Sequence, residues 1–378
     1  MNRYAETLDS LRLSGNLRSI PEESPRTDVI DFSSNDYLGL ASRPELQEEF
    51  FDDPLRRRIP MTSSASRLLC GRQREYDALE KHLGKLYGRP CLLMNSGYHA
   101  NTGLIAALAD SRTLIVADKL VHASIIDGIV LSKAPFERFR HNDFNHLERI
   151  LSKAAGKYES ILIIAESVYS MDGDRTDLER LADLRRSTPG AMLYIDEAHA
   201  VGVEGPGGLG MCRASESYVD VDVVVGTFGK AFASVGAFCA VSPVMRDYLV
   251  NRSRSLIFST AIPPVSAAWT LFLLEKILLM DAERSHLREL GHRLQVRLQP
   301  LSPGFVISPS HIQPLVLGSA EKAVEFSRLL LDAGLKVLPI RTPTVPPGTE
   351  RLRISLSAAM TTEDIDRLTD EISHISAE

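Results

Sequence analysis

One lysine of the chain lies in a sequence setting that suits covalent chemistry. Lys230 follows the apolar run Val221–Val225 and a turn that contains Gly226 and Gly229, and mostly apolar residues come after it. Apolar surroundings lower the pKa of a lysine amine by desolvation. Such an amine can form a Schiff base with an aldehyde and later act as a base. Most lysines are solvated surface charges, so this residue alone does not identify a site.

An acid and a histidine follow another apolar run. Asp196 comes directly after Met192–Ile195, and His199 follows three residues later. Open α/β sheets bind their ligands at the carboxyl ends of their strands, so both side chains are candidates for a ligand site. The simpler alternative is a solvated aspartate beside an ordinary surface histidine.

Two further strand ends carry candidate residues. After Cys91–Met94 the chain turns through Gly97 and Tyr98 into a predicted helix, whose first turn offers free backbone N–H groups to a phosphate, while Tyr98 could lie flat on a ring. His122 follows the run Thr113–Val116 near another helix start, where capping is the usual role. Each pattern also fits a plain strand–helix connection.

Hydroxyl groups complete the set. Ser170 lies in a polar segment after the apolar run Ile161–Ile164, and Thr227 immediately follows Gly226. These hydroxyls could face a ligand, although an Asp-Gly pair beside Ser170 also predicts an ordinary turn.

Pyridoxal 5′-phosphate (PLP) is a cofactor that needs all of these groups together. It requires a lysine to hold it, a carboxylate that keeps its pyridine nitrogen protonated, a polar partner for its phenolic oxygen, a group stacked on its ring and an anion site. Each residue alone has an ordinary explanation. Their coincidence at five strand ends favours a PLP site.

The elements that position these residues alternate along the chain. Short, mostly branched apolar runs are typical of strands buried on both faces, and helical segments between them predict βαβ units around a mainly parallel sheet. The expected helices are Gly97–Leu108, His122–Leu131 and Asp177–Arg186.

The pattern changes beyond Met280. Helical segments then alternate with two short strands, which indicates a smaller α+β domain. The expected elements there are Leu287–Leu298, Pro314–Leu317, Ala320–Asp332, Leu352–Leu356 and Thr362–Ser373. We therefore expect an N-terminal segment (1–43), a large α/β domain (44–280) and a small α+β domain (281–378).

Composition excludes several classes of protein. The 378 residues carry a net charge of −6, which gives no reason to expect a nucleic-acid partner. The four cysteines are scattered, and neither a signal peptide nor a membrane-spanning run is apparent, so we expect a cytoplasmic protein without a membrane partner. No metal-ligand spacing occurs. Residues 205–210 satisfy G-x-G-x-x-G but lie well beyond the preceding strand, which favours a mobile active-site loop over a dinucleotide site.

Nearly the whole chain resembles the α-oxoamine synthase family of fold-type I PLP enzymes. The resemblance rests on the Gly97-Tyr98 turn and on motifs spread along the sequence. These motifs are Phe32–Leu40, Asp118–Ser124, Ser170–Asp174, Asp196–His199, Gly226–Lys230, Ile340–Pro346 and Arg351–Arg353.

The resemblance implies roles for the cofactor site. Lys230 would hold PLP, Asp196 would pair with the pyridine nitrogen, His199 would reach the phenolic oxygen, and His122 would stack on the ring. Other residues would contribute to the phosphate and ring site or supply further polar contacts: Gly97, Tyr98, Ser170 and Thr227.

The resemblance also implies roles for substrate binding and assembly. Residues at the family's substrate-contacting places are Arg18, Asn35, Thr344 and Arg353. The family is homodimeric with its active site at the subunit interface, so Ser259 and Thr260 would reach the neighbour's phosphate.

Within the family, the chain most resembles the branch that serves biotin biosynthesis. Its members condense L-alanine with a pimeloyl thioester of CoA or a carrier protein and release CO₂. The alternatives are another member of the family, such as the ligase that uses glycine and acetyl-CoA, and a non-catalytic partner subunit. Two departures from the family pattern, at Thr62–Gly71 and Ala233, bear on substrate identity more than on cofactor use.

Overall fold

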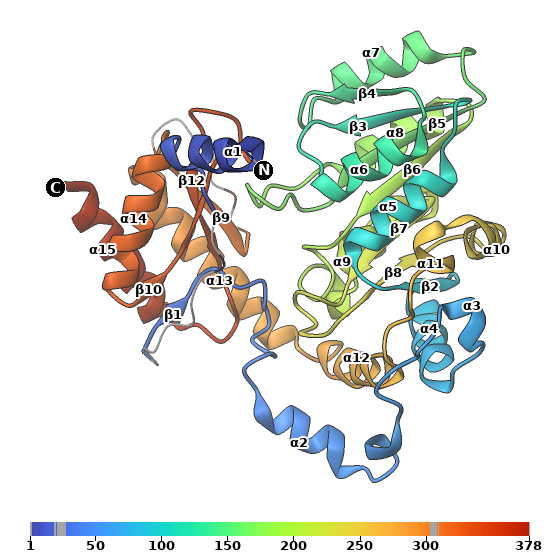
Figure 1. Ribbon diagram of the computed structural model, residues 1–378, viewed down its shortest axis with the longest axis horizontal. Coiled ribbons are helices and arrows are strands. Elements are labelled where there is room, and N and C mark those ends of the chain that lie inside the picture. Colours follow the sequence, from blue (N-terminus) through green and yellow to red (C-terminus); the bar gives the residue numbers. More distant parts are fainter. Residues whose placement is uncertain (1, 19, 21–27, 303–307, 309, 378) are drawn as a thin grey trace. The chain divides into compact units, whose positions relative to one another are not determined.

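The computed structural model describes residues 2–18, 20, 28–302, 308 and 310–377. By its internal contacts, the chain divides into two units (Figure 1). The larger unit contains Leu38–Tyr169 and Arg175–Arg284, and the smaller one contains the described residues before Leu38, the short segment Ser170–Asp174 and the chain from Ser285 onward. The division at residues 43 and 280 stays a prediction.

A seven-stranded sheet forms the centre of the larger unit. Its strands, in spatial order, are β2 (Cys91–Met94), β8 (Ala237–Ala240), β7 (Val223–Thr227), β6 (Ala191–Asp196), β5 (Ser160–Glu166), β3 (Thr113–Asp118) and β4 (Phe136–Phe139). Strand β8 is antiparallel to both of its neighbours, and the other strands are parallel. The mainly parallel sheet expected from the sequence is confirmed.

The register of the parallel strands aligns their carboxyl ends. Glu166 at the end of β5 is paired with Asp196 at the end of β6, and Asp196 is paired with Val225 of β7. The side chains that follow these strands therefore start from the same edge of the sheet.

Helices of the larger unit connect and cover these strands. They are α2 (Pro44–Asp52), α3 (Arg67–Cys70), α4 (Arg74–Tyr87), α5 (Gly97–Leu108), α6 (Ala123–Ser132), α7 (Phe144–Ala154), α8 (Leu178–Ser187), α9 (Gly210–Ala214), α10 (Pro243–Arg252), α11 (Arg254–Ile257) and α12 (Pro264–Ile277). The helix expected at Gly97–Leu108 has the same bounds in the structure.

Helices α5 and α6 pack closely above the sheet and hold the residues that follow β2 and β3 in place. Leu104 and Ile125 from these helices are fully buried in one core cluster with Tyr194 of β6. The close approach depends on Gly128, because a Cβ atom there would lie 2.7 Å from the backbone oxygen of Asn101.

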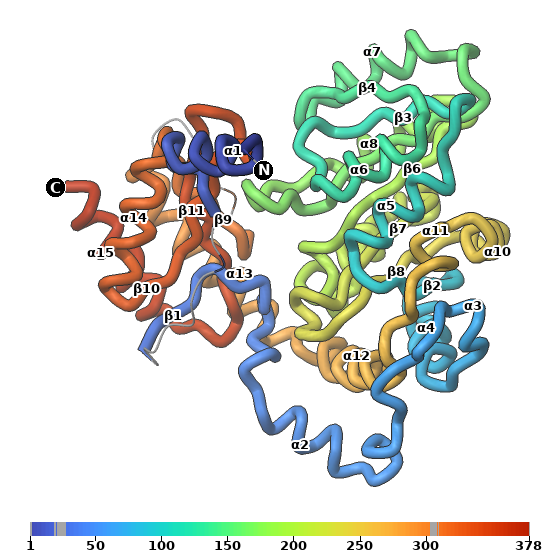
Figure 2. Tube along the Cα trace, in the orientation of Figure 1, coloured from blue at the N-terminus to red at the C-terminus, as the bar shows by residue number. Residues whose placement is uncertain are grey.

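The smaller unit contains an antiparallel sheet and a parallel strand pair. The antiparallel strands are β9 (Ile312–Val316), β12 (Arg351–Ser355) and β11 (Leu338–Ile340), with β12 in the centre. Strand β1 (Ile30–Asp31) pairs with β10 (Leu335–Lys336), so segments from opposite ends of the sequence lie side by side (Figure 2). The helices are α1 (Asn2–Leu13), α14 (Ala320–Asp332), α15 (Thr362–Ala377) and most of α13 (Asp281–Leu298).

Among the described residues, no helix combines enough length with enough apolar character to cross a membrane.

Candidate active site

A cavity of about 150 Å³ in the larger unit collects the chemistry-bearing residues. Seven residues expected from the sequence line it: Gly97, Tyr98, His122, Asp196, His199, Thr227 and Lys230. Four further residues complete the lining: Asn101, Ser124, Glu166 and Ala198. The strand ends that the sequence singled out therefore do converge on one place.

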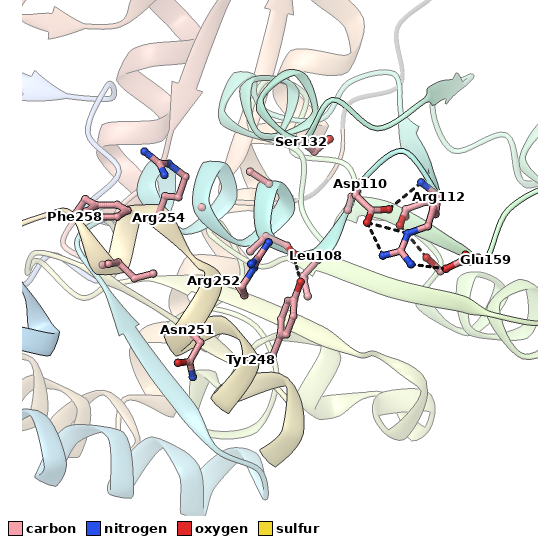
Figure 3. Close-up of a pocket in the computed structure, with 17 residues that line it drawn as sticks. Leu108, Asp110, Arg112, Ser132, Glu159, Tyr248, Asn251, Arg252, Arg254 and Phe258 are labelled. Carbon is pink, nitrogen blue, oxygen red and sulfur yellow. Dashed lines mark hydrogen bonds and ion pairs between the residues drawn. The ribbon is translucent and has the colours of Figure 1, made fainter.

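A larger cavity of the same unit, about 640 Å³, has a different character (Figure 3). Arg252 and Arg254 line it, and Arg112 forms ion pairs with Asp110 at 2.8 Å and Glu159 at 3.1 Å. Its lining contains neither lysine nor histidine. Although this cavity is larger, it lacks the amine and imidazole groups that PLP chemistry needs.

Lys230 lies beside His199 in the smaller cavity. The Nζ atom of Lys230 is 2.7 Å from Nε2 of His199. A tight turn holds the lysine, since the N–H of Phe228 donates to the carbonyl of Gly236 and the N–H of Ala233 donates to that of Lys230, at 2.9 and 2.8 Å. The lowered pKa expected for Lys230 stays a prediction.

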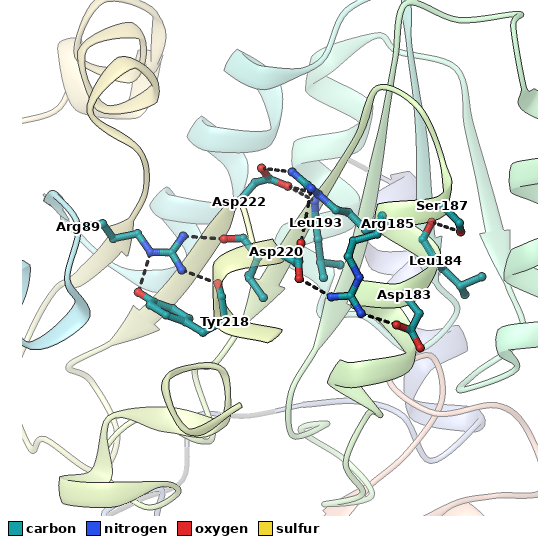
Figure 4. A network of polar contacts seen from close by, with 11 residues as sticks. Arg89, Asp183, Leu184, Arg185, Ser187, Leu193, Tyr218, Asp220 and Asp222 are labelled. Carbon is teal, nitrogen blue, oxygen red and sulfur yellow. Dashed lines mark hydrogen bonds and ion pairs between the residues drawn. The ribbon is translucent and has the colours of Figure 1, made fainter. Parts of the chain in front are cut away.

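Strand β7, which leads to Lys230, is anchored by charged groups at its opposite end (Figure 4). Asp222 accepts hydrogen bonds from Arg185 at 2.9 Å and from the backbone N–H of Leu193 at 2.8 Å. Arg89 donates to the carbonyl of Val221 at 2.6 Å and to the hydroxyl of Tyr218 at 2.7 Å. These contacts fix the start of the strand and, through its rigid backbone, the place where it ends.

Asp196 is buried and hydrogen-bonded through both carboxylate oxygens. Oδ2 accepts from Nδ2 of Asn101 at 2.7 Å, and Oδ1 accepts from the backbone N–H of Ala198 at 2.9 Å. Hydrogen bonds donated to a carboxylate favour its ionised form. The site therefore holds an oriented negative charge.

His122 both caps a helix and lines the cavity. Its Nδ1 atom accepts from the backbone N–H of Ser124 at 3.2 Å and lies 2.8 Å from the hydroxyl oxygen of the same residue. Desolvation lowers the pKa of His122, which favours the neutral imidazole. The capping role and the expected role toward a ring are therefore compatible.

The first turn of α5 leaves backbone donors toward the cavity. Ser96 caps the helix by accepting from the N–H of His99 at 3.2 Å. Gly97 and Tyr98 line the cavity, and the first N–H groups of a helix have no partner within it, so this helix start could bind an anion. Thr227 stands opposite, with Oγ1 and Cβ both 3.7 Å from where a Cβ of Gly97 would be.

The expected substrate residues belong to the smaller unit and form two groups there. Arg353 is buried; its Nε atom donates to the carbonyl of Ser170 at 2.6 Å, and Nη2 donates to Oδ1 of Asn35 at 3.2 Å. Arg18 is exposed and donates to the hydroxyl of Thr344 at 2.9 Å. Their contact with substrate, and the contact of Ser170 with the cofactor, stay predictions.

Ser259 and Thr260 are held within the larger unit by one side chain. Nδ2 of Asn95 donates to the hydroxyl of Ser259 at 2.9 Å and to the carbonyl of Thr260 at 2.5 Å. Their expected role toward a neighbouring subunit stays a prediction.

Sequence reasoning assigned no role to Asn101 or Glu166. Asn101 lies one helical turn after Gly97 on α5, and Glu166 ends the apolar strand β5. Both positions carried a usable signal, namely a polar residue on the ligand-facing turn of a helix and an acid at a strand end. What the sequence did not reveal is that both lie beside Asp196.

The G-x-G-x-x-G segment packs around a buried acid. Oε1 of Glu197 accepts from the backbone N–H groups of Met211 and Cys212 at 2.8 and 3.1 Å. A Cβ on Gly210 would lie 2.1 Å from the other carboxylate oxygen. The glycines therefore make room for Glu197 and its neighbouring backbone.

Comparison with solved structures defines the class of fold. A serine palmitoyltransferase of S. paucimobilis, solved with a bound PLP–myriocin aldimine, superposes with a TM-score of 0.89 at 26% identity, covering 99% of this chain and 97% of that one. An 8-amino-7-oxononanoate synthase of Francisella tularensis superposes with a TM-score of 0.75 at 28% identity, covering 92% and 99%. The fold is that of the fold-type I PLP transferases, as the sequence predicted.

Sequence comparison then gives the family. The model of the aminotransferase class I and II family matches residues 27–372, and the chain belongs to that family. An 8-amino-7-oxononanoate synthase of Chlorobaculum parvum is 45% identical over an alignment that covers 96% of each chain. The resemblance expected from the motifs is confirmed.

Proposed function

We propose that the chain is a PLP-dependent acyltransferase that makes 8-amino-7-oxononanoate from L-alanine and a pimeloyl thioester in biotin biosynthesis. The observation that carries this proposal is the convergence of Lys230, His199 and Asp196 on one cavity, in a chain 45% identical to a synthase of that name.

The residues of the cavity fit PLP by the chemistry of their donor groups. A primary amine, an ionised carboxylate, two imidazoles and the first turn of a helix surround one space. When bound, PLP supplies an electron sink for the negative charge that forms on the amino-acid Cα atom. The protein has to fix the cofactor's orientation and move the protons.

Each side chain then has a physical task. The Nζ atom of Lys230 would hold the cofactor, and the same amine would take the proton from the Cα atom of the amino acid. His199, whose Nε2 atom lies 2.7 Å from that amine, donates to the phenolic oxygen. Asp196 would keep the ring nitrogen protonated, so that the positive charge on that nitrogen would stabilise the developing negative charge. The imidazole of His122, which lines the cavity, would cover the ring face.

We assign the binding of substrate carboxylates to groups of the smaller unit. Arg353 offers a buried guanidinium that Asn35 and the carbonyl of Ser170 hold in one orientation. We expect this cation to bind the alanine carboxylate and orient it for loss of CO₂, because the planar fork of a guanidinium matches a carboxylate. We assign Arg18 and Thr344 to the acyl-donor side.

Product analysis tests the proposal. Purified protein with PLP is incubated with alanine or glycine, each combined with pimeloyl-CoA, a pimeloyl-carrier protein or acetyl-CoA, and the products are identified by mass spectrometry. We expect 8-amino-7-oxononanoate from alanine and a pimeloyl donor. Product only from glycine and acetyl-CoA would indicate the alternative ligase, and failure to take up PLP would indicate a non-catalytic subunit.

We further propose that the protein is a cytoplasmic homodimer. Apolar side chains are exposed on α3 and after α11, two helices that contact each other: Leu69 is 82% exposed and Phe258 is 70% exposed. Ser259 and Thr260 follow directly. A second subunit covering this surface would bring these two residues toward its own phosphate site. The four described cysteines are free, which supports a reducing compartment.

A further inference from the structure

Two carboxyl groups lie next to each other at the edge of the sheet. Glu166 and Asp196 end neighbouring parallel strands in paired register, and both are almost fully buried and line the cavity. Two adjacent buried carboxyl groups do not both ionise without a large electrostatic cost. The hydrogen bonds around the two groups therefore determine which of them carries the negative charge.

Asn101 makes three hydrogen bonds, and together they favour a negative charge on Asp196. Its Nδ2 atom donates to Oδ2 of Asp196 at 2.7 Å and to the hydroxyl of Ser124 at 2.9 Å. Its Oδ1 atom accepts from the hydroxyl of Tyr194 at 2.6 Å. Asn101 and Tyr194 are both buried, so these partners fix the direction of the amide.

We propose that Asn101 is a positioning residue that keeps Asp196, rather than Glu166, as the ionised carboxyl group of this cavity. An ionised carboxylate only accepts hydrogen bonds, and Asn101 presents an N–H to it. Asp196 receives a second N–H from Ala198, whereas Glu166 accepts only the backbone N–H of His122 among the hydrogen bonds of the described residues.

The surroundings of Glu166 agree with this division. Burial, together with the neighbouring charge of Asp196, raises the pKa of Glu166 well above its ordinary value. Lys230 and the N–H of His122 act in the opposite direction but do not outweigh burial. Glu166 is therefore the group that keeps a proton.

This inference rests on the proposed function, because it explains how the acid that faces the PLP ring nitrogen stays charged. If Asp196 took the proton in place of Glu166, the ring nitrogen would lose its anionic partner. Asn101 would then affect the protonation of the ring without touching the reacting atoms.

The first experiment reads the ring nitrogen directly. The ¹⁵N chemical shift of ¹⁵N-labelled PLP bound to the protein is followed between about pH 6 and pH 9, the range where a weakened acid pair should titrate. We compare the wild type with Asn101→Leu, which removes the donor at similar volume, and with Tyr194→Phe, which only frees the amide to turn. Thr102→Ala is the matched control, since its hydroxyl bonds only to helix backbone.

We expect a protonated ring nitrogen throughout in the wild type and in Thr102→Ala. In Asn101→Leu the nitrogen should lose its proton within this range, which is a tenfold or larger change in its proton affinity. Tyr194→Phe should change the affinity in the same direction by less. Wild-type shifts in both variants would overturn the inference. If Asn101→Leu fails to fold, Tyr194→Phe decides by the same criterion.

A second measurement does not need the cofactor. Infrared spectra of PLP-free protein show the carbonyl band of each neutral carboxyl group, and Glu166→Gln and Asp196→Asn identify the bands of these two residues. We expect Asn101→Leu to add a neutral band that disappears when Asp196→Asn is combined with it. An unchanged spectrum would contradict the inference. If the wild type did not bind PLP, the proposed function would be wrong. The infrared measurement would still test the role of Asn101, because it uses PLP-free protein.

Discussion

The Nζ atom of Lys230 is the single group through which every step of the proposed chemistry passes. It lies 2.7 Å from His199 and is held by a turn whose backbone hydrogen bonds close on both sides of it. The lysine has no substitute among the residues that line the cavity.

Replacement of Lys230 tests this requirement. We expect Lys230→Ala to abolish turnover and the covalent retention of PLP after borohydride treatment, measured by product formation and by mass spectrometry of the protein. Lys153→Ala, at an exposed lysine of α7, should match the wild type in both measurements. A Lys230→Ala protein that still turned over at the wild-type rate would rule out the proposed chemistry.

Ala233 in the lysine turn has a backbone conformation that residues with a Cβ atom rarely adopt. Its φ angle is +44°, and its N–H donates to the carbonyl of Lys230. The left-handed region costs a non-glycine residue about 1 to 2 kcal/mol, while glycine adds a smaller entropic cost. We therefore expect Ala233→Gly to raise the free energy of unfolding by about 0.5 to 1 kcal/mol in urea titrations.

Ala231 provides the control in the same turn. It is buried and has no positive φ angle, so Ala231→Gly gains no relief and loses a packed methyl group. We expect it to lower the free energy of unfolding. Equal effects of the two substitutions would show that strain at Ala233 is not the cause.

At the scale of elements, the glycine-rich segment that leads into α9 and includes its first residue packs around Glu197, the acid that follows β6. Gly210 has a φ angle of +92°, and a Cβ there would lie 2.1 Å from a carboxylate oxygen of Glu197. Gly156, between α7 and β5, has a φ angle of +72° and no atom within 4 Å of its Cβ position. Both glycines have a positive φ angle, but only Gly210 lacks room for a Cβ atom.

Alanine substitutions at these two glycines therefore separate the cost of a steric clash from the cost of backbone strain. We expect Gly156→Ala to lower the free energy of unfolding by about 1 kcal/mol, from backbone strain alone. Gly210→Ala should lower it by at least about 2 kcal/mol more, because a buried carboxylate has to move. Urea denaturation of both variants measures the difference, and equal losses would contradict the close fit around Glu197.

Glu197 also predicts a pH dependence of stability. Burial raises its pKa to about 7, from an ordinary value of 4.5. The folded state therefore keeps a proton that the unfolded state has lost, and stability falls as the pH rises from about 4.5 to about 7. Glu197→Gln removes this titration, so its stability relative to the wild type should increase with pH, by up to about 3 kcal/mol above pH 7.

Urea titrations at several pH values with saturating PLP measure this effect. Glu216→Gln changes an exposed carboxyl group and should leave the pH dependence unaltered. The same slope in the wild type and in Glu197→Gln would contradict the raised pKa.

The sequence predicted those elements whose residue pattern is visible within the element itself. The runs that became β2, β3, β5, β6 and β7 were found because buried parallel strands are almost uniformly apolar. Strand β4 was missed because its sequence Phe-Glu-Arg-Phe carries charges at the sheet edge, and β8 because Ala-Phe-Cys-Ala has no β-branched residue. The residues that follow the strand ends could be predicted as a group, whereas the network of Asn101 depends on packing between α5 and β6.

At the scale of the whole molecule, the exposed apolar side chains near α3 and α11 predict the assembly. We expect Phe258→Glu to shift the protein from dimer to monomer in analytical ultracentrifugation and to weaken PLP binding, because a charge opposes burial of this surface. Val219→Glu is the control, since Val219 is 85% exposed on another part of the unit. A Phe258→Glu protein that stays dimeric with unchanged PLP affinity would place the interface elsewhere.

Between Tyr169 and Arg175 the chain leaves the larger unit and contributes five residues to the smaller one. This arrangement limits the design of chimeras between this enzyme and its relatives. Those five residues belong to the smaller unit, where the carbonyl of Ser170 accepts from Arg353, although the sequence on either side belongs to the larger unit. A chimera joined at a single crossover near residue 285 would inherit Arg353 from one parent and its carbonyl partner from the other. To exchange substrate preference between relatives, the three segments of the smaller unit have to be transferred together. They are the residues before Leu38, Ser170–Asp174 and the chain from Ser285 onward.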